Sequence, residues 1–401
     1  MLHLEISDLK VKSYSSLKAK LSSIKKQPLP VFEKYKEDVE KLKQVIEKHR
    51  KYKNLIVIGN GGSNTSFKAF HHALVPMDYK KKEFILTTME PDLMNEVKNT
   101  FPRRKTLVMP ISKSGTTIGV IESMLALKDY DMLPVTSPEG GALAVIAEKE
   151  KFDIIPHPPV GGRFSGLTAS AFAPALFFGI DVGEIDDGAR TVYKYCGPQV
   201  PIEKNPALQL AASLYLLEKK GYSEVFCPIY SSKLVGFENL IVQLMHESVC
   251  KKDRGQTFYC AEAPESQHHT NQRFFGGKKN VVGLFMTVEN QDDNDSKVVV
   301  PDAIRGVGVR GGKLKDISNV PYFKALEYEF KGTYQDAVNK KIPVAHLSLD
   351  KVSAFTVGEF IGFWHYVAVY SSMLRDVDPY DQPQVESSKD ISFKLRKEHN
   401  F

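Results

Sequence analysis

Short apolar runs alternate with amphipathic stretches through the first half of the chain, and this alternation constrains the fold more than any other feature of the sequence. The apolar runs are Leu55–Ile58, Phe84–Leu86, Thr106–Ile111, Met132–Val135 and Phe152–Ile155. Helical patterns follow them near residues 64–74, 92–100, 116–128, 142–150 and 166–178. Strands and helices in this order predict a parallel sheet with helices on both faces. The ligand crevice of such a sheet lies at the carboxyl ends of its strands.

A second α/β unit is expected after residue 206. Its strands are predicted at Glu224–Tyr230, Thr257–Ala261, Val281–Val288 and Pro343–Leu347, and its helices at 207–220, 234–249, near 268–275, 321–340 and 355–374. Two similar halves indicate a duplicated architecture, although no residue-level repeat is found. The sequence therefore predicts an α/β fold with two doubly wound, flavodoxin-like parallel-sheet domains and helical N- and C-terminal extensions.

Composition and periodicity divide the chain into five expected segments. Apolar side chains at 3,4 spacing near the N-terminus predict one amphipathic helix, whose stripe is formed by Phe32, Tyr35, Val39, Leu42 and Ile46. Glycine and proline become frequent after the first domain and indicate a crossing linker. The expected segments are an N-terminal helical extension at 1–53, a first domain at 54–182, the linker at 183–206, a second domain at 207–375 and a C-terminal tail helix at 376–401.

No motif in the sequence predicts a metal site. The acidic run QDDND at 291–295 lacks the glycine and the terminal glutamate of an EF-hand, and a hairpin turn is expected there instead. The cysteines have neither CxxC nor Cys/His spacing, which argues against a structural zinc and against a disulfide scaffold. Free thiols in a reducing cytoplasm are expected. The cysteines are Cys196, Cys227, Cys250 and Cys260.

The basic charge is confined to the N-terminal extension. The 401-residue chain has a net charge of +6, but residues 1–53 hold 14 Lys/Arg against 7 Asp/Glu, which leaves −1 for residues 54–401. No basic stripe with interleaved aromatics is present, which argues against a nucleic-acid partner. No apolar run reaches membrane-spanning length, and the N-terminus lacks the apolar core of a signal peptide. We expect a cytoplasmic protein with no membrane or nucleic-acid partner.

The loop SKSGTT at 112–117 follows the third predicted strand and precedes an amphipathic run. Backbone N–H groups at the start of a helix, with the positive end of its dipole, can hold an anion. Gly115 lets the backbone approach closely, and hydroxyls add donors. A helix cap is the alternative, but capping accounts for one hydroxyl and not four. The hydroxyl residues of this predicted phosphate-binding loop are Ser112, Ser114, Thr116 and Thr117.

Two further loops are expected at the same edge of the first sheet. The turn GNGGSN at 59–64 follows the first strand, but a dinucleotide fingerprint would need a third glycine at its end and an acidic residue about 20 positions on. The Gly62 N–H and the Ser63 hydroxyl are expected to face the same crevice as the SKSGTT loop. After the fifth strand, VGGRFS at 160–165 places Arg163 where it can stabilise an anion or developing oxyanion, or lie at the surface.

Candidate acid–base groups lie in the second half of the chain. Glu247 ends a predicted helix among apolar residues, where a carboxylate can serve as a general base. His268 and His269 lie in a polar stretch, and one of them could transfer protons near neutral pH. Lys389 is expected in the first turn of the tail helix, where the dipole disfavours a cation and a substrate oxygen could compensate. The structural alternatives are a solvated glutamate, a surface or core histidine pair and an ordinary helix lysine.

Six motifs along the chain carry a resemblance to a known family. They are GNGGS at 59–63, SKSGTT at 112–117, VGGRFS at 160–165, Glu-Ser-x-x-Lys at 247–251, Ser-Gln-His at 266–268 and Asp-Gln-x-x-Val-Glu-x-x-Lys at 381–389. Each is modestly specific alone. In this order, over nearly the whole chain, they make the sequence resemble the phosphoglucose isomerases, which are built from two sugar-isomerase domains.

The resemblance implies a role for each matching position. Glu247 matches the catalytic base, which moves a proton between C2 and C1 through a cis-enediolate, and Arg163 matches the residue that stabilises the enediolate charge. His268 matches the acid/base that opens the sugar ring, and Lys389 matches a helper at the ring oxygen. The implied phosphate- and substrate-binding residues are Gly62, Ser63, Ser112, Lys113, Ser114, Thr116, Thr117, Gly162, Gln243 and Gln382.

The resemblance also implies an activity and a partner. The activity is reversible isomerisation of glucose 6-phosphate and fructose 6-phosphate in glycolysis and gluconeogenesis, without a redox cofactor or metal. The partner is a second copy, in a homodimer whose active site borrows the histidine of the neighbouring subunit. Two alternatives stay open: an isomerase that also uses mannose 6-phosphate or an amino-sugar phosphate, and a non-catalytic sugar-phosphate-binding regulator. Pro158, Gly166 and Gln384 depart from the family's pattern and leave the catalytic side chains in place.

Overall fold

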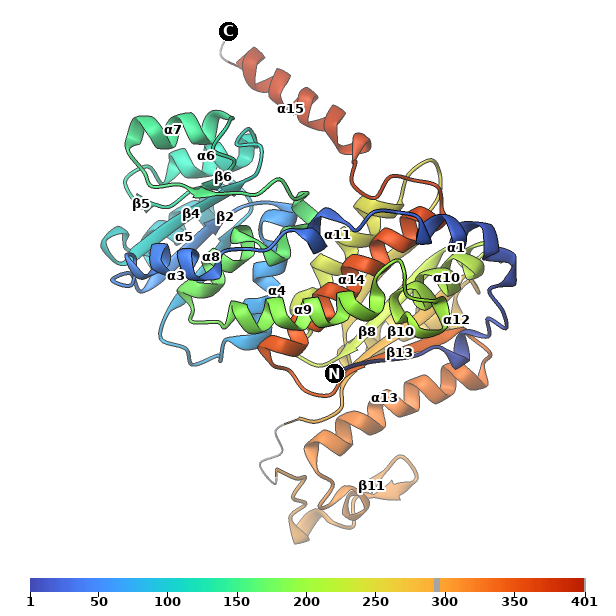
Figure 1. Ribbon diagram of the computed structural model, residues 1–401. Coiled ribbons are helices and arrows are strands. Elements are labelled where there is room, and N and C mark those ends of the chain that lie inside the picture. Colours follow the sequence, from blue (N-terminus) through green and yellow to red (C-terminus); the bar gives the residue numbers. More distant parts are fainter. Residues whose placement is uncertain (292–295, 400–401) are drawn as a thin grey trace.

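The computed structural model describes residues 1–291 and 296–399, which form a mixed α/β fold with two large sheets (Figure 1). All strand pairs in these two sheets are parallel except one at an edge. The expected α/β fold class is therefore confirmed. The predicted hairpin turn at 291–295 lies outside the described residues apart from Gln291.

The first sheet has the strand order β3-β2-β4-β6-β7, with β5 beside β4. Side chains of β2 alternate between two apolar clusters, one on each face, so this strand is apolar throughout. The strand expected at 132–135 is split into β5 and β6 around Pro134, because proline has no N–H for the sheet. The elements are β2 (Asn54–Ile58), α4 (Thr65–Leu74), β3 (Lys82–Leu86), α5 (Pro91–Thr100), β4 (Thr106–Ser112), α6 (Ile118–Ala126), β5 (Asp131–Met132), β6 (Val135–Thr136), α7 (Ala142–Glu150), β7 (Ile155–Pro156) and α8 (Ala169–Phe177).

The second sheet has the strand order β1-β13-β10-β8-β9. Its edge strand β1 (Leu2–Glu5) pairs antiparallel with β13 and was not predicted, because four residues are too short to show an alternating pattern. The other elements are α10 (Pro206–Glu218), β8 (Glu224–Tyr230), α11 (Glu238–Val249), β9 (Thr257–Glu262), α12 (Thr270–Gly276), β10 (Val281–Val288), α13 (Tyr322–Asn339), β13 (Val344–Leu349) and α14 (Ala354–Leu374).

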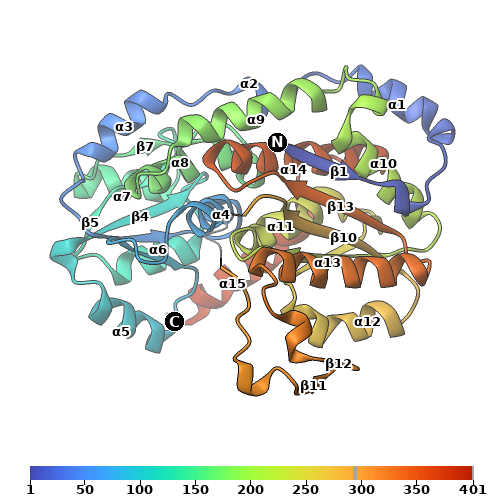
Figure 2. The same ribbon diagram turned by 90° about the horizontal axis from the view of Figure 1, so that it is seen from below.

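Most of the segment expected as a linker is a helix, α9 (Val182–Cys196), which packs against α14 (Figure 2). Gly188 of α9 serves close packing and not flexibility. A Cβ added to Gly188 would lie 1.9 Å from the carbonyl oxygen of Phe355, and one added to Gly358 on α14 would lie 1.9 Å from that of Ile185. The two helices therefore cross with their backbones nearly in contact. A glycine-rich sequence alone does not distinguish this arrangement from a loop.

Helix α14 is the central helix of the fold. Almost all of its 21 residues are buried, including the aromatic side chains of Trp364, Tyr366 and Tyr370. It packs against α9, α10 and α11. Despite this apolar character, none of the helices in the described part of the chain has both the length and the hydropathy needed to cross a membrane.

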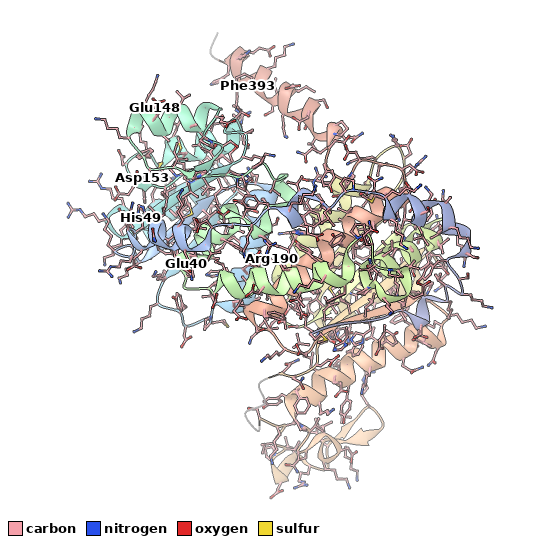
Figure 3. The ribbon with its side chains drawn as sticks, in the orientation of Figure 1. Glu40, His49, Glu148, Asp153, Arg190 and Phe393 are labelled. Atoms are coloured by element: carbon pink, nitrogen blue, oxygen red, sulfur yellow. The ribbon has the colours of Figure 1, made fainter. Side chains whose placement is uncertain are left out.

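The N-terminal extension contains α1 (Lys18–Lys25), α2 (Val31–Lys34) and α3 (Val39–Glu47). The prediction of one helix over the apolar stripe was wrong, because the chain is extended at Tyr35 and a new helix begins after Asp38. The Asp38 carboxylate caps α3 by accepting from the Lys41 N–H at 3.0 Å. Arg190 of α9, labelled in Figure 3, donates to the carbonyl oxygen of Tyr35 at 3.0 Å. The stripe itself is buried or half-buried.

Two segments project from opposite ends of the molecule (Figure 1). One contains the hairpin of β11 (Gly308–Val309) and β12 (Gly312–Lys313). The other is α15 (Glu386–His399), none of whose described residues is buried. Arg396 of α15 donates to the Glu122 carboxylate of α6 at 2.8 Å. This ion pair joins the tail helix to the helix that follows the SKSGTT loop.

Candidate active site

A cavity of about 970 Å³ lies at the carboxyl ends of the strands of the first sheet. Its walls are the loops after β2, β4, β6 and β7, one face of α11, and the C-terminal tail with α15. Phe393, labelled on α15 in Figure 3, is among the lining residues. Every predicted site residue except His268 lines this cavity. Their chemical roles stay predictions, but the fold brings them to one place.

The strand order explains why the first two loops meet. From β2 the chain moves to β3 on one side and then returns to β4 on the other. At such a reversal the loops leave the sheet on opposite faces, and a crevice opens between them. The turn at 59–63 and the loop at 112–117 border this crevice. Topology therefore places both glycine-rich sequences at the same ligand site.

The SKSGTT loop presents its hydroxyls at the cavity wall. The Ser112 and Thr117 hydroxyl oxygens lie 3.0 Å apart, and the Thr116 hydroxyl donates to that of Ser114 at 2.9 Å. Thr117 is the N-cap residue of α6, yet among the described residues its side chain makes no capping hydrogen bond. Gly115 has a φ of +64°, which glycine adopts without strain. The start of α6 and these hydroxyls together suit an anion.

The glycines of the GNGGSN turn let it pack tightly against its neighbours. Gly61 has a φ of +56°, and a Cβ there would lie 2.8 Å from the Gln243 amide nitrogen. A Cβ on Gly62 would lie 2.1 Å from the backbone carbon of Gly162. The loops after β2 and β7 therefore touch through their backbones. Packing of the site requires glycine at both positions, and no dinucleotide is needed to explain them.

A buried arginine and a partly exposed glutamate form an ion pair in the cavity. Arg163 Nε lies 3.0 Å from Glu247 Oε2, and the Glu247 side chain is 29% exposed. The Arg163 guanidinium also donates to the carbonyl oxygens of Pro379 and Asp381, at 3.1 and 3.2 Å, and to the side chain of Gln382. Burial lowers the pKa of Arg163, and the carboxylates around it oppose that shift. The arginine links the loop after β7, α11 and the tail.

The second carboxylate oxygen of Glu247 is also held. Gln243, one helical turn earlier on α11, donates from Nε2 to Glu247 Oε1 at 3.0 Å. The Gln243 Oε1 in turn accepts from the Thr65 hydroxyl at 3.0 Å. Thr65 is the first residue of α4 and was not predicted as part of the site. No local pattern could reveal this contact, since the two residues lie 178 positions apart.

A buried lysine fixes the tail segment that carries Gln382. Lys251 is 6% exposed, and its ammonium lies 2.6 Å from the Asp381 carboxylate. It also donates to the carbonyl oxygen of Asp378. Together with Arg163 it anchors the chain just before α15. Lys251 belongs to the Glu-Ser-x-x-Lys motif, but the sequence assigned it no role.

The two remaining predicted catalytic residues differ in position. Lys389 of α15 lines the cavity, with its side chain 58% exposed and its ammonium 2.8 Å from Glu386. His268 ends a short 3₁₀ helix (Glu265–His268), is exposed, and is not among the residues that line the cavity. The His269 ring contacts the Thr270 hydroxyl at 2.7 Å. A single chain therefore does not bring a histidine of this pair to the site.

The cavity has a mixed but slightly positive lining, which suits a phosphate ester. Its charged residues are Lys113, Arg163, Lys389, Arg396, Glu139, Glu247 and Glu386. Across residues 1–291 and 296–399, no group of three or more His, Cys, Asp or Glu side chains is arranged to hold a metal ion.

Sequence comparison finds relatives along most of the chain, although no protein-family model matches it. The chain is 26% identical over 381 residues to the glucose-6-phosphate isomerase of Methanocaldococcus jannaschii, spanning 91% of this chain and 88% of the relative. It is 27% identical over 376 residues to the glucose-6-phosphate isomerase of Acholeplasma laidlawii, spanning 90% and 87%.

Solved structures share the fold over almost the whole chain. A hypothetical protein from Thermus thermophilus matches with a TM-score of 0.84 at 24% identity, covering 98% of this chain and 99% of its own. A glucose-6-phosphate isomerase from Chlamydia trachomatis matches with a TM-score of 0.74 at 18% identity, covering 97% and 76%. At these identities the likeness concerns the fold alone.

Proposed function

We propose that the chain is an aldose–ketose isomerase that reversibly interconverts glucose 6-phosphate and fructose 6-phosphate. One observation carries this proposal: the Glu247–Arg163 pair, 3.0 Å apart, faces the same cavity as the hydroxyl loop at 112–117. A sugar phosphate held at that loop would direct its reacting carbons toward the pair. The sequence relatives named glucose-6-phosphate isomerase support the same reaction.

The phosphate binds at the crevice between β2 and β4. Its oxygens accept from backbone N–H groups at the start of α6 and at Gly62, and from the surrounding hydroxyls. Lys113 adds a positive charge. This anchor fixes one end of the substrate, so that the other end meets the catalytic groups in one orientation. The hydroxyls in this role are those of Ser63, Ser112, Ser114, Thr116 and Thr117, all on residues that line the cavity.

Isomerisation moves one proton between neighbouring carbons. Glu247 takes the proton from C2 of the open-chain aldose, and the electron pair forms a cis-enediolate. The hydroxyl proton of O2 moves to O1, and Glu247 returns the first proton to C1, which leaves the ketone at C2. The positive charge of the buried Arg163 guanidinium stabilises the enediolate oxygen. The aldehyde is reduced while the neighbouring alcohol is oxidised in the same molecule. The reaction therefore needs no redox cofactor.

Ring opening uses groups beyond this pair. Lys389 assists at the ring oxygen, and Gln243 and Gln382 contact substrate hydroxyls. We propose a homodimer in which His268 of each subunit serves as the ring-opening acid/base in the cavity of the other. The exposure of His268, and its place outside the cavity of its own chain, support this arrangement.

The proposed domains follow the two sheets, except that the edge strand β1 of the second sheet lies in the N-terminal extension. Residues 54–182 contain β2 to β7, and residues 207–375 contain β8 to β13, so that each range holds one expected sugar-isomerase domain. Residues 183–206 connect them largely as helix α9, and residues 376–401 supply the tail with Lys389. We propose a cytoplasmic enzyme that acts in glycolysis and gluconeogenesis.

A coupled assay tests the proposed reaction. Fructose 6-phosphate is supplied, and glucose 6-phosphate formation is followed with an NADP-linked dehydrogenase in the presence and absence of a chelator. We expect turnover in both conditions. Mannose 6-phosphate and glucosamine 6-phosphate, supplied separately, test the wider substrate range. Binding of sugar phosphates without turnover of any of them would contradict the proposal and favour a regulator.

A further inference from the structure

The Thr65 hydroxyl is a buried group that the proposed mechanism does not use. Thr65 is 6% exposed, and its hydroxyl donates to Gln243 Oε1 at 3.0 Å. In the described part of the chain Thr65 is not among the residues that line the cavity. Its hydroxyl can therefore act on the site only through Gln243.

The orientation of the Gln243 amide decides whether it supports Glu247. A glutamine amide has a donor nitrogen and an acceptor oxygen at nearly equivalent positions, and a half-turn exchanges them. In the observed orientation Nε2 donates to Glu247 Oε1 at 3.0 Å. The reversed orientation would set the amide oxygen against the carboxylate oxygen, two acceptors with no proton between them. A donor at the far side of the amide stabilises the observed orientation, and Thr65 supplies that donor.

The space around the amide is also restricted. Gln243 and Glu247 lie four residues apart on α11 and hence on the same face of the helix. The amide nitrogen fits because residue 61 is glycine, where a Cβ would lie 2.8 Å away. Arg163 holds the other carboxylate oxygen, Oε2, at 3.0 Å. Both oxygens of Glu247 thus have a directional partner, which fixes the plane of the carboxylate.

We propose that Thr65 is a positioning residue for the general base: its hydroxyl fixes the Gln243 amide, which with Arg163 aims the Glu247 carboxylate at C1 and C2. This inference rests on the proposed function of Glu247. A base that must serve two neighbouring carbons in turn gains from a fixed carboxylate plane, because small misplacements of a reacting group lower the rate steeply. We expect the larger effect on kcat, since Thr65 touches neither the phosphate loop nor the substrate, and a smaller effect on KM through the proposed contact of Gln243 with the substrate.

Two substitutions isolate the hydroxyl. Thr65→Val removes it at nearly constant volume, and Thr65→Ser keeps it. We expect Thr65→Val to lower kcat about tenfold with KM within about twofold, the scale of one neutral hydrogen bond, while Thr65→Ser stays within about twofold of wild type in both. If Thr65→Val does not fold, Thr65→Ala tests the same hydroxyl. A folded Thr65→Val or Thr65→Ala variant with wild-type kcat would overturn the proposal.

A double-mutant cycle tests the route through Gln243. If Thr65 acts only on that amide, adding Thr65→Val to Gln243→Ala should change kcat by less than about twofold. Effects that multiply instead would overturn the proposal, because Thr65 would then act by another path.

A third measurement separates this proposal from the proposed function. The NMR signals of the Gln243 side-chain NH₂ group are identified by their loss in Gln243→Ala. They report the hydrogen bond from Gln243 Nε2 to Glu247 without any turnover. We expect their exchange with solvent to be slow in wild type and in Thr65→Ser and clearly faster in Thr65→Val. Unchanged exchange would overturn the positioning role even in an active enzyme. The expected exchange pattern in a protein without isomerase activity would instead overturn the proposed function.

Discussion

Replacing Arg163 separates the chemistry of the site from its anchoring. The residue is 4% exposed and holds Glu247, two tail carbonyls and the Gln382 side chain. Arg163→Met removes the charge and all of these donors at similar length. Arg163→Lys keeps the charge but replaces the planar fork with a single ammonium. Comparing the two variants distinguishes the need for a positive charge from the need for its geometry.

The expected losses follow from these contacts. Removing one preorganised group that stabilises a developing oxyanion lowers kcat by about 10²–10³, or about 2.7–4 kcal/mol. We expect a loss of kcat near the upper end of this range for Arg163→Met and near the lower end for Arg163→Lys. KM should rise less than about tenfold, because the loop at 112–117 is unchanged and Gln382 is the one proposed substrate-binding residue that loses a contact to Arg163. Unfolding free energy should fall by about 2–3 kcal/mol in Arg163→Met, below the value for a fully buried pair, since water reaches Glu247.

Steady-state kinetics in the coupled assay, on variants shown by urea unfolding to be folded, measure both quantities. Wild type and Arg163→Lys serve as the matched references for Arg163→Met. A folded Arg163→Met variant that keeps kcat within about threefold of wild type would refute the role of the guanidinium in stabilising the enediolate.

Three further changes test the anchor, the tail and the core. Replacing Ser112 and Thr117 together with alanine should raise KM about tenfold or more and leave kcat within about threefold; a larger effect on kcat would contradict a pure anchoring role. Lys251→Met removes the buried cation that holds Asp381, so limited proteolysis should cut the tail faster and KM should rise about tenfold; an equally protected tail would contradict this. Burial lowers the pKa of the His365 imidazole to about 3, so the unfolded chain binds a proton at this side chain more readily than the folded chain. The free energy of unfolding should therefore fall by about 3 kcal/mol between pH 6.5 and pH 4. Urea titrations should show a smaller loss in His365→Gln, and an equal loss would contradict this origin.

Local patterns predicted the strands well where the signal is strong. The bounds of β8 and β10 agree with the predicted runs, because both are continuous apolar segments between turns. The meeting of the loops at 59–63 and 112–117 also followed from sequence, since parallel strands deliver their carboxyl ends to one edge. The sequence therefore predicted the features that depend on periodicity and on the topology of parallel strands.

Contacts between distant segments could not be predicted. Edge strand β1 forms by pairing with β13, where Leu2 lies opposite Leu349. Four residues carry too little pattern to predict this pairing. Gly188 of the expected linker is instead the point where α9 contacts the backbone of α14. Gly166 lies in close packing, since a Cβ there would lie 2.3 Å from the end of the Ile361 side chain and 2.5 Å from the Ser66 hydroxyl. In each case the structure depends on a contact with a residue far away in the sequence.

The same limit applies to the site. The sequence indicated Glu247 and Arg163 separately, but their 3.0 Å pairing is a product of the fold. The Thr65 contact to Gln243 has no counterpart in any local motif. His268 differs from these cases, because the resemblance already implied that the histidine of each cavity comes from a neighbouring subunit, and in the structure His268 lies outside the cavity of its own chain.

Proton exchange at the sugar carbons tests the central claim most directly. In deuterated water, NMR follows the replacement of the transferred hydrogen in glucose 6-phosphate and fructose 6-phosphate by wild type and by Glu247→Gln, while calorimetry measures sugar-phosphate binding. We expect exchange in wild type, a loss of about 10²–10⁴-fold in Glu247→Gln, and binding affinity within about threefold. Exchange at the wild-type rate in the folded Glu247→Gln variant would contradict the assignment of this carboxylate as the group that carries the proton.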